Sequence, residues 1–396
     1  MKDKEIILPL AISSWDEEEK HAINKVIESD NFTMGNNVSA FEKEFASYHG
    51  SKYCVMVNSG SSANHLGISS LFFRKDGQKL SIGDEIIVTA VSWSTTYSPL
   101  YYHGLKPRFV DVDIDTLNID TKKLADSINP KTKAIFAVNL LGNPNDFNEI
   151  KKIADENNLL LIEDNCESLG AVYEKKKTGT FGLFGTCSGF FSHHMSTMEG
   201  GMITTDDEEI YHILLSIRAH GWTRDLPKQN KLTKKSDDDF MESFRFVLPG
   251  YNFRPLEFSG SLGSVQLTKL DRFIKQRRAN AQLFQEIFDK YSFLKIQKEI
   301  GESSWFGFSI ILEKESEVSR ESFINFLNLH GIESRPIVAG NIIHNPMIDF
   351  FDYSIHGKLV NADQVHFNGL FIGNHHNEIK DSLKKLDNLI FKNFGT

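Results

Sequence analysis

The chain has little cysteine and no long apolar stretch. Three cysteines, Cys54, Cys166 and Cys187, are widely spaced in 396 residues and form no CxxC pair. This spacing argues against a disulfide framework and a cysteine-held zinc ion, and it fits a reducing compartment. No segment approaches the roughly 18 apolar residues of a membrane helix, and the first apolar run is too short for a signal peptide. We therefore expect a cytoplasmic protein that does not enter a membrane.

Basic residues are fewer than acidic ones. Lysine and arginine number 44 against 53 acidic residues, which gives a net charge of −9 and argues against a nucleic-acid surface. The hydrophobic share of 40% and the charged share of 24% are ordinary for a globular protein. A chain of this length predicts one large domain with a smaller C-terminal lobe and room for a deep site.

Short apolar segments alternate with amphipathic ones through the first half of the chain. Strands are predicted at 53–57, 85–90, 108–112, 134–138 and 159–162, and helices near 14–28, at 38–48, after Asn58 and at 148–156. The alternation predicts an α/β fold with a mostly parallel sheet covered by helices on both faces. Ligands bind such sheets at the carboxyl ends of the strands.

The second half of the chain has a less regular pattern of predicted strands and helices. Residues 224–239 are charged and polar and indicate either a lid or a solvated surface insertion. A long helical pattern covers 264–288, and strands at 305–312 and 332–337 alternate with helices at 319–330 and 377–394. We expect a large domain over 1–254 and a small α+β domain over 255–396.

Paired histidines, His193 and His194, stand between a small-residue strand and a Glu-Gly-Gly turn. Such a segment can deliver imidazoles into a pocket, although an ordinary strand and turn fits it too. Gly60, Ser61 and Ser62 open a helix directly after a strand. Free N–H groups and hydroxyls there suit a phosphate, while helix capping is the structural alternative.

Three carboxylates, Glu163, Asp164 and Glu167, follow the predicted strand at 159–162. Buried carboxylates need a partner, which is either a protonated ring nitrogen or an ordinary backbone cap or arginine. No histidine is close in sequence, which disfavours a metal site. Trp93 offers a flat face for a ring or is a core residue. Together with Ser188 as a further phosphate contact, these residues outline a site for pyridoxal phosphate.

The chain resembles the fold type I pyridoxal-phosphate enzymes of the DegT group of sugar-nucleotide aminotransferases over nearly its whole length. The matching stretches are 30–35, 57–64, 83–88, 109–113, 163–165, 199–201, 250–255 and 265–271. The resemblance implies a mostly parallel, seven-stranded type of sheet with flanking helices. It also implies that Gly60, Ser61, Ser62, Trp93, Asp164, Glu167, Ser188 and Asn252 bind the cofactor, Asn252 from a partner subunit in a homodimer with shared sites.

One departure from that family concerns a missing lysine. The aminotransferases carry a lysine before the Glu-Gly-Gly turn that binds the cofactor covalently, and here His193 occupies its position. No other lysine occurs between Lys177 and Lys228. Histidine cannot form a stable imine with the cofactor but is a good proton shuttle. This pattern resembles the 3-dehydratases of the family, whose likeness extends to 305–308 and 339–341.

The resemblance implies loss of the C3 hydroxyl from an NDP-4-keto-6-deoxyhexose, with His193 as base and L-glutamate restoring pyridoxamine phosphate. The step belongs to deoxysugar and surface-polysaccharide (lipopolysaccharide O-antigen) synthesis. No cysteine follows the histidine turn, so we expect no iron–sulfur cluster. Candidate substrate contacts are His194, Arg254, Arg335 and His344. The alternatives are a sugar aminotransferase that tolerates histidine and a non-catalytic relative.

Overall fold

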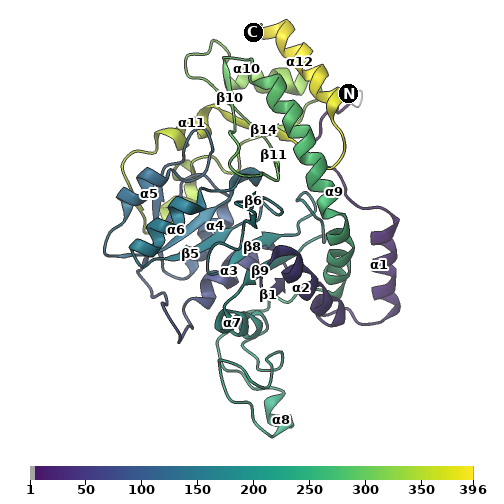
Figure 1. Ribbon diagram of the computed structural model, residues 1–396, viewed down its shortest axis with the longest axis vertical. Coiled ribbons are helices and arrows are strands. Elements are labelled where there is room, and N and C mark those ends of the chain that lie inside the picture. Colours follow the sequence, from purple (N-terminus) through teal and green to yellow (C-terminus); the bar gives the residue numbers. More distant parts are fainter. Residues whose placement is uncertain (1–4, 396) are drawn as a thin grey trace.

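The computed structural model describes residues 5–395, and its centre is a mixed sheet of eight strands (Figure 1). The strand order is β1-β9-β8-β5-β4-β2-β3-β13, and only β9 runs antiparallel to its neighbours. The strands are β1 (Tyr53–Val57), β2 (Glu85–Thr89), β3 (Lys106–Val110), β4 (Thr132–Val138), β5 (Leu160–Asp164), β8 (Gly185–Ser188), β9 (Gly201–Thr205) and β13 (Ser354–Ile355). The predicted α/β fold with a mostly parallel sheet is confirmed, and the two-residue strand β13 adds an eighth strand at the edge of the expected seven.

Helices cover both faces of this sheet because its central strands are apolar on both sides. Ile86 and Val88 of β2 pack into one core with α3 (Gly60–Ser70), α4 (Ser94–Tyr102) and α7 (Glu208–Arg218). Ile87, between them, points to the opposite core with α5 (Thr121–Ser127) and α6 (Phe147–Glu156). The two-residue period of a strand thus assigns successive side chains to different layers.

The C-terminal part forms a smaller layer above the large sheet (Figure 1). Four antiparallel strands have the order β10-β11-β14-β12, with β10 (Leu294–Ile296), β11 (Gly307–Leu312), β14 (Gly369–Gly373) and β12 (Ser334–Arg335). Their apolar face packs on α10 (Arg320–Leu329), α12 (Lys380–Phe394) and the end of the long helix α9 (Glu257–Phe288). The remaining elements are α1 (Glu17–Glu28), α2 (Asn36–His49), β6 (Val172–Tyr173), β7 (Lys176–Lys177), α8 (Asp239–Glu242), α11 (Val360–Asn368) and the short helices η1 (Leu140–Gly142), η2 (Ile342–His344) and η3 (Pro346–Phe350).

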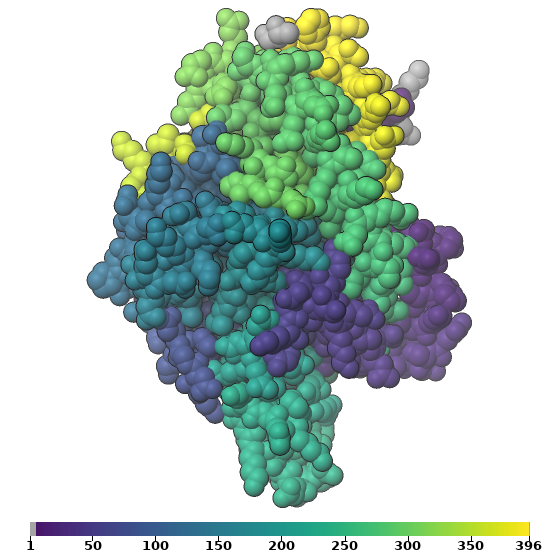
Figure 2. Space-filling view, viewed as in Figure 1, coloured from purple at the N-terminus to yellow at the C-terminus, as the bar shows by residue number. Residues whose placement is uncertain are grey.

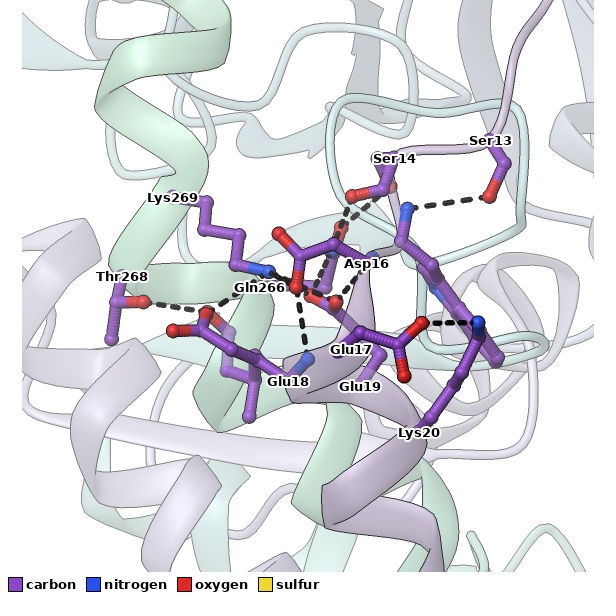
Figure 3. A network of polar contacts seen from close by, with 12 residues as sticks. Ser13, Ser14, Asp16, Glu17, Glu18, Glu19, Lys20, Gln266, Thr268 and Lys269 are labelled. Atoms are coloured by element: carbon purple, nitrogen blue, oxygen red, sulfur yellow. Dashed lines mark hydrogen bonds and ion pairs between the residues drawn. The ribbon is translucent and has the colours of Figure 1, made fainter.

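A polar network fastens α1 to α9 (Figure 3). Asp16 and Glu19 form a capping box at the start of α1. Lys269 of α9 reaches the Glu19 carboxylate at 2.8 Å and also pairs with Asp16 and Glu18. The Glu19 side chain is fully buried, and Gln266 donates a further hydrogen bond to it at 2.6 Å. The N-terminal helix is therefore held by one buried carboxylate.

Some predicted bounds were wrong. The long helix starts at Glu257 rather than 264, and only Ser334–Arg335 of the predicted strand at 332–337 pairs as a strand. The predicted loop at 224–239 is irregular and projects with α8 from the rest of the molecule (Figures 1 and 2). Within residues 5–395, no helix has the length and apolar character needed to cross a membrane. The domain boundary at 254 and 255 stays a prediction; β13, from the second part, pairs with β3 of the large sheet.

Candidate active site

A cavity of about 330 Å³ opens at the carboxyl ends of β4 and β5 beside the start of α3. This is the edge at which a parallel sheet is expected to bind ligands. Eight of the predicted site residues line it: Gly60, Ser61, Trp93, Asp164, Glu167, Ser188, His193 and Arg335. They come from positions up to 275 residues apart, so the fold alone brings them together.

Five predicted residues lie outside that wall. The hydroxyl and N–H of Ser62 are both within 3.0 Å of Ser59 Oγ, in the cap of α3. His194 is buried, with Nε2 3.1 Å from the carbonyl oxygen of Ser304. His344, on the surface, lies 2.8 Å from the Asp363 carboxylate. Their assigned roles stay predictions.

Asn252 and Arg254 lie together near the base of the projecting segment. Nε of Arg254 donates to the Asn252 side-chain oxygen at 3.0 Å, and Asn252 is exposed. Asn252 could contact a partner subunit, because its side chain is exposed and does not line the cavity of its own subunit. That contact also stays a prediction.

Asp164, at the end of β5, is held in place by three donors. Asn64 Nδ2 at 2.8 Å and Thr96 Oγ1 at 2.7 Å donate to Oδ2, and the Cys166 N–H donates to Oδ1 at 3.1 Å. These bonds fix the carboxylate while one side of it faces the cavity. Apart from the family match over 57–64, no local pattern marks Asn64 or Thr96, which stand near the N-termini of helices that follow strands.

Glu163, the neighbour of Asp164, has a structural role. Its buried carboxylate accepts hydrogen bonds from the N–H groups of Gly179, Phe181 and Gly182 at 2.6–2.8 Å and one from Asn139 at 3.2 Å. Burial raises its pKa, while these donors oppose the shift. The backbone-cap alternative therefore describes Glu163, and it leaves Asp164 for the cavity.

The start of α3 lines the cavity, and the first N–H groups of a helix have no partner within the helix itself. Ser59 caps the helix, and Gly60 packs against Ser188 so closely that a Cβ at residue 60 would lie 2.7 Å from the Ser188 Cβ. Ser61 is exposed, and its Oγ donates to Thr95 Oγ1 at 2.8 Å. A helix N-terminus flanked by hydroxyls is a suitable site for a phosphate dianion.

Opposite the helix, Glu167 and Arg335 add charge. Burial raises the pKa of Glu167 to about 7, and the nearby Arg335 cation opposes that shift. The Arg335 guanidinium lies 4.6 Å above the Phe371 ring. Its buried Nε has no hydrogen-bond partner among residues 5–395. Arg335 is thus a fixed cation with donors to spare for an anionic group.

His193 projects into the cavity from the turn after β8. Its ring is 5.0 Å from the Phe306 ring and 5.9 Å from the Phe190 ring, centroid to centroid. Its buried Nδ1 has no partner in the described part of the chain. Burial, followed by the Arg335 and Arg277 cations, lowers the pKa of His193 to about 3. The imidazole is therefore neutral near pH 7 and able to accept a proton.

The donor set fits pyridoxal phosphate. The α3 N-terminus suits the phosphate, Asp164 suits a protonated ring nitrogen, and Trp93, 54% exposed at the cavity mouth, offers a face for the ring. Gly60 leaves the space beside Ser188 that a side chain would fill. None of the described residues that line the cavity is a lysine, so this wall offers only non-covalent contacts.

Comparison with known proteins agrees with this geometry. The profile of the DegT/DnrJ/EryC1/StrS aminotransferase family matches residues 13–386. GDP-4-keto-6-deoxy-D-mannose 3-dehydratase from Yersinia pseudotuberculosis is 56% identical over 98% of this chain and 99% of its own length.

Solved structures give the same picture. The Escherichia coli GDP-4-keto-6-deoxy-D-mannose-3-dehydratase with bound hydrated PLP superposes with a TM-score of 0.96 at 56% identity and covers 98% of this chain and 100% of its own. A structure of GDP-4-keto-6-deoxymannose-3-dehydratase with a trapped PLP-glutamate geminal diamine has a TM-score of 0.95 at 56% identity, covering 96% and 99%. The chain belongs to the DegT/DnrJ/EryC1/StrS aminotransferase family.

Proposed function

We propose that this protein is a pyridoxal-phosphate-dependent 3-dehydratase of GDP-4-keto-6-deoxymannose. The observation that carries the proposal is the neutral imidazole of His193 in a cavity whose described wall has no lysine. The names of the relatives, at 56–57% identity over nearly the full chain, support the same substrate. The product, a 3,6-dideoxy-4-ketosugar, would serve surface-polysaccharide synthesis.

The cofactor is proposed to be held by non-covalent contacts alone. When bound, the pyridoxal ring supplies an electron sink for bond breaking next to the sugar carbonyl. Asp164, whose carboxylate is held by hydrogen bonds from Asn64 and Thr96, would hold the proton of the ring nitrogen. Ser61, Ser188 and the α3 N–H groups bind the phosphate.

His193 is proposed to move the proton. A neutral imidazole can take a proton from carbon and give it to the departing C3 hydroxyl, which leaves as water, so one residue can serve both transfers. Unlike a lysine, His193 has no amine that could bind the cofactor covalently or help to release an aminated product. The chain's own residues thus favour removal of oxygen over transfer of nitrogen.

The amino group is proposed to come from L-glutamate, in agreement with the glutamate adduct named for a relative. Arg335, with its unpaired Nε, is the candidate to bind an anionic group of glutamate or the nucleotide. Asn252 is proposed to complete the site of a second copy in a homodimer. We further propose that the enzyme acts in the cytoplasm.

A product assay tests the function directly. The purified protein is incubated with pyridoxal phosphate, L-glutamate and GDP-4-keto-6-deoxymannose, and the mass of the nucleotide sugar is measured by mass spectrometry. A dehydratase gives a sugar that has lost one oxygen atom and contains no amino group. A sugar that keeps its C3 oxygen and gains nitrogen would instead identify an aminotransferase, and an unchanged sugar would contradict both.

A further inference from the structure

The segment 304–306, just before β11, forms part of the cavity wall. The ring of Phe306 lies 5.0 Å from the His193 ring, with the two planes inclined by 60°. The carbonyl oxygen of Ser304 is 3.1 Å from His194 Nε2. His193 and His194 therefore both contact the segment 304–306, which comes from the other half of the chain.

This segment has a strained backbone that its surroundings must hold. Trp305 has φ 48°, a left-handed value that bulky residues rarely adopt. On one side, the N–H groups of Ser304 and Phe306 donate to the carbonyl oxygens of Gly142 and Leu141 at 2.9 and 3.0 Å. A Cβ on Gly142 would lie 2.5 Å from the Trp305 nitrogen, so the two segments pack backbone to backbone.

On the other side, the segment is held by Arg277 of α9. Its Nη1 donates to the carbonyl oxygens of Phe306 at 3.0 Å and Asn374 at 2.6 Å, and it lies 3.5 Å from that of Trp305. Arg277 is 4% exposed and pairs with no carboxylate among residues 5–395. Burying a cation without a carboxylate partner costs free energy. Arg277 is therefore not explained by space filling alone.

We propose that Arg277 is a positioning residue for His193: it holds the 304–306 segment so that the Phe306 ring fixes the place of the imidazole in the cavity. Arg277 does not line the cavity and acts through Phe306. The contacts are independent of the reaction; only the predicted effect on turnover rests on the proposed function.

The charge of Arg277 supports this assignment. Burial lowers the pKa of His193 most, the Arg335 cation comes next, and the Arg277 cation contributes less than either. The Arg277 cation also lowers the pKa of His194. A cation in this place therefore helps to keep the imidazole neutral. The charged and titratable groups around His193 are Arg335 from β12, Arg277 from α9, its neighbour His194, and the cavity carboxyl groups of Asp164, Glu167 and Glu199.

Turnover of the cofactor-loaded enzyme gives the first test. Arg277→Gln removes the cation, and Phe306→Leu removes the ring but leaves the backbone acceptors of Arg277. Both should lower kcat by about 10- to 100-fold, because small misplacement of a catalytic group has effects of that size, with KM for the sugar changing less than about 3-fold. Arg278→Gln is the matched control. Arg278 is the next residue of α9 and donates to the Ser303 carbonyl oxygen at 2.8 Å, outside the segment, so its kcat should stay near that of the unaltered enzyme.

The second test needs no cofactor and no activity. In protein labelled at its histidine rings, the NMR signal of His193 is identified by its loss in His193→Asn. Phe306→Leu should shift this signal through loss of the ring current, and Arg277→Gln should raise its titration midpoint, because a cation is removed. An unmoved His193 signal in both variants would overturn the proposal, as would an equal loss of kcat in Arg278→Gln. If the signal moves but the unaltered protein removes no oxygen, the positioning role stands and the proposed function fails.

Discussion

Asn64 Nδ2 lies 2.8 Å from Oδ2 of Asp164 and links the N-terminal half of α3 to the end of β5, 100 residues away. Thr96, in the first turn of α4, donates to the same oxygen at 2.7 Å. Two helices that follow β1 and β2, strands on either side of β5 in the sheet, thus hold one carboxylate. These hydrogen bonds hold the Asp164 carboxylate in one orientation at the cavity wall.

Thr96→Val should weaken cofactor binding by about 10-fold, since it removes one hydrogen bond to a charged group at nearly constant volume. Titration of the apoprotein with pyridoxal phosphate, followed by absorbance, measures the change. Thr89→Val is the control: it also removes a buried hydroxyl, but one that donates to the Val91 carbonyl oxygen. Equal affinities for the two variants would show that Thr96 does not support the Asp164 contact.

His193→Asn should leave cofactor affinity nearly unchanged and lower the rate of deoxygenation by about 10²- to 10⁴-fold, the usual contribution of a general base. The amide side chain keeps much of the volume and polarity but cannot accept the proton. Single-turnover mass detection of the sugar, with the cofactor saturating, separates the two quantities. Deoxygenation at the unaltered rate would remove His193 from its proposed role.

His193→Lys should convert the cavity toward a covalent site, because the lysine amine can form an imine with pyridoxal phosphate. Reduction with borohydride and mass analysis of the intact protein would then find the cofactor attached, and the sugar product should contain some nitrogen. His193→Arg is the matched control, since it places a cation there that forms no imine. Absence of attached cofactor in the lysine variant would indicate that residue 193 does not reach the cofactor aldehyde.

Much of this fold and part of this site could be predicted from local patterns. The strand β1 has the predicted bounds because five apolar residues stand between turn signals. Ser61, Asp164 and Ser188 meet at one edge because strand ends in a mostly parallel sheet do so. These predictions depend on sequence neighbours and on one topological rule.

The remaining contacts depend on distances that no local pattern encodes. Asn64 and Thr96 look like ordinary residues near helix N-termini, and the pairing of β5 with both β8 and β4 brings Asp164 to them. Ser62 resembles Ser61 in sequence, yet its hydroxyl accepts from Ser59, which also caps its N–H. The role of Arg277 depends on acceptors up to 97 residues away. Tertiary packing decided each of these cases.

Lys269→Met should open the N-terminal helix, because Glu19 would remain buried without its cation (Figure 3). Loss of one partner of a buried pair costs about 3–5 kcal/mol. Hydrogen exchange of the α1 amides should report a loss of that order in the free energy of local opening. The exposed Lys275 of the same helix serves as control, and Lys275→Met should change α1 exchange by less than about 0.5 kcal/mol. Unaltered α1 protection in Lys269→Met would show that apolar contacts alone dock this helix.

His49 should make the protein sensitive to acid far from the active site. It is buried against Phe45, with ring centroids 5.3 Å apart, and burial lowers its pKa from 6.5 to about 3. Between these two values the unfolded chain binds a proton that the folded chain does not, so the stability present above pH 6.5 is lost as the pH falls.

The expected slope for this one residue is about 1.4 kcal/mol per pH unit between pH 6.5 and pH 3. His49→Leu should reduce the measured pH slope of the free energy of unfolding by that amount, even if it changes the stability at pH 7. His21→Leu, at an exposed position of α1, should leave the slope unaltered. If the slopes of His49→Leu and the unaltered protein coincide, then His49 takes up its proton equally in both states, and any acid sensitivity comes from other titratable groups.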